Sequence, residues 1–264
     1  MSGKRLYELL LDHANLGVAV ERVQLGVNWT LCQAGASGLA STLGGSTWAS
    51  EAQPLHGRPL AELAAWLSRW DRQQASVGLA AVNAALNREA DMVYASGTLY
   101  KGQDAAQSAF DTFLPWITGQ RVAVIGPVLP FSTPQPIGEL HLFAPAEGAL
   151  GARAESLLPQ ADWLFVHAQT LADKTLPRIL ELAEGARCVL YGAQTPWLDE
   201  LHEFGIDYLL GVQIDEPQRL HTVVAEGGDL ANLAHVLSFR LLCLDKQAGE
   251  LNPFTSPASA RAGR

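Results

Sequence analysis

The sequence contains few cysteines, and their spacing matches no metal-binding or redox motif. Only three occur among 264 residues, Cys32, Cys188 and Cys243, and none is in CxxC spacing. Their odd number and wide separation exclude a zinc finger or dithiol motif of the usual spacing and favour a reducing compartment. We therefore expect a cytoplasmic protein.

Long hydrophobic runs and positive charge are also scarce. No apolar run approaches the roughly 20 residues that span a membrane. The apolar stretch after the basic start of MSGKRLYELLLDH is short and is interrupted by Asp12 and His13, which predicts an amphipathic helix and not a signal peptide. With 18 basic and 27 acidic residues the net charge is −9, which argues against nucleic acid as a partner. We expect neither a membrane nor a nucleic-acid partner.

Three familiar ligand-binding motifs are missing from the sequence. The seven histidines include no HExxH pair, and the Gly-rich stretch 35–46 lacks the GK[ST] ending of a P-loop. VAVIGPVLPFSTPQPIG (122–138) stands where a dinucleotide-binding turn would be, but Pro127 directly follows Gly126 and further prolines come soon after. Proline removes backbone N–H groups that would bind phosphate, so the segment argues against conventional NAD binding. It is either a rigid surface connection or a fixed loop that walls a pocket.

The clearest structural unit in the sequence runs from Ala161 to Pro196. WLFVHA and CVLYGA are typical of strands buried on both faces, and the apolar residues between them repeat at helical spacing. A crossover this short is right-handed and parallel, so both strands end at one edge of a sheet, where ligands bind. The residues expected at that edge are His167, Gln169, Thr170, Asp173, Gln194, Thr195 and Pro196.

The whole chain predicts two units of different architecture. Residues 1–96 indicate a small α+β domain, with a helix over 4–14, a strand over 18–27, a hairpin near 34–41 and two helices from about Leu60 and Gln73. Residues 97–251 indicate five mostly parallel strands alternating with helices, a three-layer α/β domain. Asp229 is expected to cap a long final helix over 230–246, whose apolar face leaves a scaffold role or a homodimer open. The segment 252–264 predicts a mobile tail.

His167 and Asp173 are the two candidates for metal ligands. An imidazole and a carboxylate can bind a divalent transition metal such as zinc, nickel or cobalt. The alternatives are a core histidine with its hydrogen bonds satisfied and an acid that caps a helix, a role that Thr175 could also fill. Two groups do not complete a metal site, and the sequence indicates no third.

The order and spacing of several segments resemble a bacterial and archaeal family whose C-terminal half is described as a putative heavy-metal chelation domain. These segments are ASVGLAAVNAALN (75–87), VAVIGP (122–127), LLPQADWLFVHAQTLADKTLPRIL (157–180), YGAQTPWLDELHEFGIDYLLGVQI (191–214) and VVAEGG (223–228). The resemblance spans about residues 5–245. It implies an enolase N-terminal-like domain followed by a Rossmann-like domain, with a ligand site in the cleft between them. The residues matching the motifs expected there are Trp29, Thr30, Asn83, Gly126, Pro127, Thr170, Asp173, Thr175, Gln194, Thr195 and Pro196.

The chain departs from the family pattern at four places. Thr-Gly is usual at His167-Ala168, Asn at Asp173 and a Gly-Pro-Ser-like run at 192–194, and a Glu is expected where this chain has Ala144. Losing a carboxylate weakens a metal site, whereas the gained His and Asp can build a different one. The resemblance implies binding of a small molecule, a metal ion or a metal chelate, with a role in heavy-metal chelation or homeostasis. The alternative is an enzyme acting on a small polar or nucleoside-like ligand at the carboxyl edge of the sheet.

Overall fold

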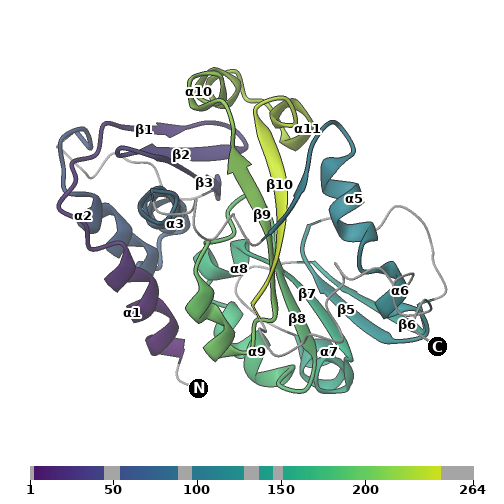
Figure 1. Cartoon of the computed structure of the whole chain (residues 1–264). Helices are drawn as coiled ribbons and strands as arrows, with labels where there is room; N and C mark the ends of the chain where they lie inside the picture. The colour runs from purple at the N-terminus through teal and green to yellow at the C-terminus, as the bar shows by residue number, and fades with distance from the viewer. Residues whose placement is uncertain (1–2, 45–53, 89–96, 128–136, 145–150, 245–264) are drawn as a thin grey trace, which may run out of the picture.

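The computed structural model describes residues 3–44, 54–88, 97–127, 137–144 and 151–244. Its strands form two sheets, one three-stranded and antiparallel, the other seven-stranded and mostly parallel (Figure 1). This confirms the predicted α/β class with a mostly parallel sheet. No helix within these ranges is long and apolar enough to cross a membrane. The tail over 252–264 and most of the proline-rich segment after Pro127 lie outside the described residues.

The small sheet has the order β1-β2-β3 and is formed by Arg22–Leu25, Trp29–Gln33 and Ser37–Ser41. The first strand is shorter than the prediction over 18–27. The N–H of Gly26 donates to the carbonyl of Trp29 at 2.9 Å, so the chain has already turned there. The predicted hairpin is present as the pair β2 and β3.

Helices pack together beside the small sheet, and the longest of them, which lies directly against the sheet, is almost completely buried. They are α1 (Gly3–His13), α2 (Leu60–Ala64), the 3-10 helix η2 (Ala65–Ser68) and α3 (Arg72–Leu86). Asp71 caps α3 by accepting the N–H of Gln74 at 2.8 Å. A Cβ at Gly78 would lie 2.0 Å from the nitrogen of Leu67, and one at Gly38 would lie 2.1 Å from the nitrogen of Ala84. The backbone of α3 therefore approaches the backbones of both η2 and β3 closely.

The large sheet has the order β4-β10-β9-β8-β7-β5-β6. Its strands are β4 (Thr98–Tyr100), β5 (Arg121–Ile125), β6 (Glu139–Phe143), β7 (Trp163–His167), β8 (Arg187–Tyr191), β9 (Tyr208–Ile214) and β10 (Leu237–Cys243). The five strands from β6 to β9 are parallel, and β10 is antiparallel to both β9 and β4. The parallel pair predicted for the 161–196 unit is confirmed as β7 and β8.

Helices lie on both faces of the large sheet. On β5, Val122 and Val124 belong to the apolar cluster of one face, whereas Ala123 and Ile125 belong to the cluster of the other. The first cluster contains α5 (Ala105–Asp111) and α6 (Leu114–Ile117), which lie on the far side of the sheet from α1 in Figure 1. The second contains residues of α7 (Ala152–Leu157), η3 (Leu158–Gln160), α8 (Gln169–Ala172) and α9 (Leu176–Leu182).

Two predicted helices of this half take a different form. The single helix expected between β7 and β8 is divided into α8 and α9, because Lys174 between them adopts a φ of 62°. Asp173 is the C-cap residue after α8, and Thr175 is the N-cap residue before α9, where its side chain makes no capping hydrogen bond. The helical connection expected between β8 and β9, from the predicted alternation of strands and helices, is the 3-10 helix η4 (Asp199–Phe204).

The prediction of a long final helix over 230–246 is wrong. Asp229 does cap a helix, in a capping box with Asn232, but that helix is α11 (Leu230–Leu233) and β10 follows it. A short apolar run such as LSFRLLC fits a buried strand as well as a buried helix, and pairing along the whole of β9 decides for the strand. The helix face considered for a homodimer is therefore not present.

Hydrogen bonds join the small sheet and its helices to the rest of the chain at several places. Tyr7 of α1 donates its hydroxyl to the carbonyl of Leu171 in α8 at 2.8 Å. At another place, Gln24 of β1 donates to the carbonyl of His221 at 3.0 Å, in α10 (Pro217–Ala225). Asn28 donates to the carbonyl of Gly227 at 2.9 Å, just after α10.

Candidate functional site

A cavity of about 360 Å³ lies beyond the carboxyl ends of β5, β7 and β8. The parallel strands lie in the order β6-β5-β7-β8-β9, so successive crossovers diverge between β5 and β7. Ligands of open parallel sheets bind outside such a point. Trp29 and Ser41 of the small sheet form part of the lining, so the cavity is bounded by both sheets.

The lining is aromatic and uncharged. Phe110 of α5 and Phe239 of β10 contribute apolar surface, and Tyr191 lies edge-on to Phe110 with 5.1 Å between ring centroids. Burial lowers the pKa of His167 to about 4 and raises the pKa of the Tyr191 hydroxyl, so both groups are neutral at pH 7. None of the lining residues that the structure describes is an acid, a lysine, an arginine or a cysteine. The cavity thus offers aromatic surface together with neutral hydrogen-bonding groups.

Three lining residues carry a buried polar atom without a hydrogen-bond partner among the described residues. These atoms are Nε1 of Trp29, Nδ1 of His167 and the hydroxyl of Tyr191. Leaving a buried donor or acceptor unpaired costs about 1–3 kcal/mol. Their concentration around one cavity is therefore a reason to look for a ligand or a water that pairs with them.

Two glycines keep the strand ends open beside these groups. A Cβ at Gly126 would lie 2.0 Å from the Tyr191 hydroxyl, and one at Gly192 would lie 2.8 Å from Nε2 of His167. Gly192 also has a φ of 127°, which side-chain-bearing residues rarely adopt. Neither Tyr191 nor Gly192 is among the site residues predicted from the sequence. The available signal was an aromatic residue followed by glycine at the end of CVLYGA, on the same edge as His167.

The predicted site residues divide into those at the cavity and those held in internal hydrogen bonds. Trp29, Pro127 and His167 line the cavity, and Gly126 lies beside its Tyr191 wall. Away from the lining, the Thr30 and Thr42 hydroxyls are 3.0 Å apart, Thr170 donates to the carbonyl of His167 at 2.8 Å, and Thr195 donates to that of Leu210 at 3.2 Å. Thr175 directly precedes α9 as its N-cap residue, and Pro196 is buried.

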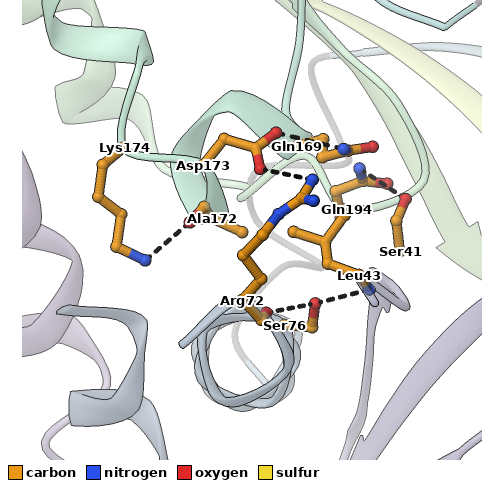
Figure 2. Close-up of polar contacts among 9 residues, drawn as sticks. All are labelled: Ser41, Leu43, Arg72, Ser76, Gln169, Ala172, Asp173, Lys174 and Gln194. Atoms are coloured by element: carbon orange, nitrogen blue, oxygen red, sulfur yellow. Dashed lines mark hydrogen bonds and ion pairs between the residues drawn. The ribbon is translucent and has the colours of Figure 1, made fainter. Parts of the chain in front are cut away.

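Asn83 and Gln194 join the small sheet to the loop after β8. The Nδ2 of Asn83 donates to the carbonyls of Leu39 and Gln194, each at 2.9 Å. The Nε2 of Gln194 donates to the hydroxyl of Ser41 at 3.1 Å (Figure 2). Because Ser41 lines the cavity and Gln194 follows Gly192 and Ala193, these bonds fix two of its walls relative to each other.

His167 and Asp173 have different surroundings. The Asp173 carboxylate accepts from Nη2 of Arg72 at 3.3 Å and from Nε2 of Gln169 at 3.2 Å (Figure 2), and its side chain is 8% exposed. A metal ion at Asp173 would compete with the Arg72 guanidinium. Among the residues that the structure describes, no three His, Cys, Asp or Glu side chains come together to hold a metal. A site built from His167 and Asp173 stays a prediction, and it would need further ligands.

Two family models match the chain, and both carry the description "Putative heavy-metal chelation". DUF364 matches residues 108–243 and DUF4213 matches residues 7–86. The chain belongs to this family. The resemblance read from the sequence is thereby confirmed, and the matched segments include most of the cavity lining.

Two solved structures of DUF364 proteins, both described as of unknown function, share the fold. The protein from Desulfitobacterium hafniense is 24% identical, with a TM-score of 0.77 over 90% of this chain and 98% of its own. The protein from Pyrococcus horikoshii is 16% identical, with a TM-score of 0.69 over 92% of this chain and 100% of its own. No curated protein matches the chain significantly.

Replacing Arg72 with alanine should lower the free energy of unfolding by about 1–2 kcal/mol, because the nearly buried Asp173 carboxylate loses its cationic partner. The pair is partly exposed on the Arg72 side, so we expect less than the cost of breaking a fully buried pair. Urea unfolding measures the change. The double variant Arg72→Ala/Asp173→Asn should recover part of the loss, and an equal or larger loss would contradict the pairing.

The stability of the metal-free protein should fall between about pH 6.5 and pH 4, in part because of His167. The unfolded chain takes up a proton on this side chain near pH 6.5, whereas the folded protein resists protonation until the lowered pKa of about 4. The contribution is fully present above pH 6.5 and amounts to at most roughly 3 kcal/mol. Urea unfolding at several pH values should show a shallower decline for His167→Gln. Parallel profiles would show that His167 is not held neutral by burial.

Proposed function

We propose that the protein binds a small organic molecule without net charge, or a metal chelate without net charge, in the cavity at the ends of β5, β7 and β8. The observation that carries this proposal is the uncharged aromatic lining with its three unpartnered polar atoms. The described lining holds no charged side chain that could pair with an ionised ligand. Moving such a ligand from water into the cavity would therefore cost desolvation energy that no counter-charge offsets. A neutral flat molecule with hydrogen-bonding edges suits the same surroundings.

The family description supports a role for a metal, and the chemistry of the lining favours the chelated form. A transition metal held by protein alone takes about four ligands in a structural site and three in a catalytic one. His167 is the one metal-binding type of side chain in the described lining. A metal that arrives already bound to an organic chelator needs few further ligands, so it fits where a bare ion does not.

We further propose that this cavity is a cleft between two domains. In this division, residues 1–96 form an enolase N-terminal-like domain and residues 97–251 a Rossmann-like domain. Its support is that each part has its own sheet and matches its own family model. The same proposal places the protein in the cytoplasm, in keeping with the absence of a disulfide among the three cysteines, all of which the structure describes.

A second candidate function is an enzyme acting on a nucleoside-like molecule. The position of the cavity at the divergence point of a parallel sheet favours it, because such points often hold nucleotides and their relatives. Stabilisation by adenosine, together with its conversion to a new product, would distinguish this function from simple binding.

Equilibrium binding to matched neutral and charged ligands tests the proposal. The quenching of tryptophan fluorescence can report binding, because Trp29 lines the cavity. We expect 2,2′-bipyridine to bind at least about tenfold more tightly than its dicarboxylate, a difference of about 1.4 kcal/mol. Equal affinities, or preference for the dicarboxylate, would contradict an uncharged site.

A further inference from the structure

We propose that the ligand of this cavity carries a hydrogen-bond acceptor, such as a ring nitrogen or a carbonyl oxygen, to which the hydroxyl of Ser41 donates. This inference rests on the proposed function, because it names the class of neutral molecule that the same cavity selects. It makes Ser41 a specificity-determining residue, although Ser41 is not among the site residues predicted from the sequence.

Ser41 reaches the cavity from the last position of β3 and is partly exposed. Its register partner across the antiparallel pair is Trp29 of β2, which also lines the cavity. Directly opposite residues of such a pair lie on the same face of the sheet, with Cβ atoms about 4.5–5.5 Å apart. The small sheet therefore presents a hydroxyl and an indole side by side to whatever the cavity holds.

A hydrogen bond from Gln194 decides what the Ser41 hydroxyl can offer a ligand. Nε2 of Gln194 donates to Oγ of Ser41 at 3.1 Å (Figure 2). An amide nitrogen only donates, so this bond uses a lone pair of Oγ and leaves the hydroxyl proton for another acceptor. Among the residues that the structure describes, none accepts that proton. Gln194 is itself held in place, because its carbonyl accepts from Nδ2 of Asn83 at 2.9 Å.

The other polar groups of the lining also favour an acceptor on the ligand. Nε1 of Trp29 can only donate, is buried and has no partner among the described residues. The neutral imidazole of His167 has one donor and one acceptor, so it favours neither kind of ligand. A ligand that brought only donors would leave both the Ser41 proton and the Trp29 N–H unpaired, which is unfavourable in a buried site.

The test compares quinoline, whose ring nitrogen only accepts, with indole, whose ring N–H only donates. Both are flat, bicyclic and neutral at neutral pH, so the aromatic walls contribute similarly to each. The proteins are the wild type, Ser41→Ala and, as a matched control, Thr42→Val. The Thr42 hydroxyl lies 3.0 Å from that of Thr30, and neither residue is part of the lining. Calorimetric titration gives the affinities, and thermal unfolding checks that each variant folds.

We expect Ser41→Ala to bind quinoline at least about fivefold more weakly than the wild type does, and to bind indole within about twofold of it. Thr42→Val should bind both molecules within about twofold of the wild type. Equal losses of affinity for the two molecules in Ser41→Ala, or a larger loss for indole, would overturn the donor role of Ser41.

A second variant keeps the test decisive if Ser41→Ala does not fold. Ser41→Cys preserves the shape of the side chain but offers only a weak S–H donor, so it should still lose at least about threefold in affinity for quinoline. Unchanged quinoline binding by Ser41→Cys would overturn the inference. If the wild type bound neither molecule, the proposed function would fail for flat neutral ligands, and the inference would fail with it.

Discussion

Replacing Ala106 with tryptophan should weaken ligand binding by at least about 100-fold, or 2.7 kcal/mol, while the protein remains folded. Ala106 lies on α5, lines the cavity and is only half-buried, so its side chain has room to extend. An indole at this position would occupy the space beside Phe110 that we assign to the ligand. Calorimetric titration with 2,2′-bipyridine measures the loss.

The matched control places the same side chain two residues further along α5. Ser108 is exposed and is not part of the lining, so Ser108→Trp adds an indole at the surface of this helix. We expect its affinity for bipyridine to stay within about threefold of the wild type. Equal binding by Ala106→Trp and the wild type would place the ligand elsewhere.

Replacing Gly78 with alanine should lower the free energy of unfolding by about 3 kcal/mol, although alanine is the better helix former. The new Cβ would lie 2.0 Å from the nitrogen and 2.6 Å from the Cα of Leu67, and 2.6 Å from the carbonyl carbon of Trp66. These are backbone atoms of η2, which cannot turn aside as a flexible side chain can. Helix α3 would have to move, and it is buried between η2 and the small sheet.

Urea unfolding of Gly78→Ala beside Gly185→Ala tests this expectation. A Cβ at Gly185 meets nothing within 4 Å, so that variant should differ from the wild type by no more than about 0.5 kcal/mol. Unchanged or increased stability of Gly78→Ala would show that α3 does not pack on η2 as closely as described.

The sequence predicts the large sheet well where local patterns and chain connectivity agree. WLFVHA and CVLYGA are short apolar runs with a helical pattern between them, and they form the parallel neighbours β7 and β8. The parallel direction of the two strands then places His167 at the ligand-binding edge. The prediction fails at Leu237–Cys243, because only the pairing with β9 distinguishes a buried strand from a buried helix there.

The candidate site is less accessible to sequence reasoning because its walls come from distant elements. Trp29 is 162 residues from Tyr191 along the chain, and Ala106 and Phe239 lie on two further elements. Polar residues at strand ends, such as Thr170 and Thr195, are predicted as ligand-binding groups from the sequence. In the structure their hydroxyls instead donate to backbone carbonyls of the protein. The apolar walls carry no such signal, since Ala193 and Leu210 resemble any core residue in the sequence.

Native mass spectrometry of the untagged protein, purified without added chelators, tests most directly whether this cavity holds a small molecule or its metal complex. We predict that the wild type carries an adduct with the mass of an organic molecule, alone or with a metal, and that Ala106→Trp lacks it. An adduct present on both proteins at equal occupancy would contradict the cavity as the site. A bare metal ion without an organic part would contradict the uncharged organic ligand.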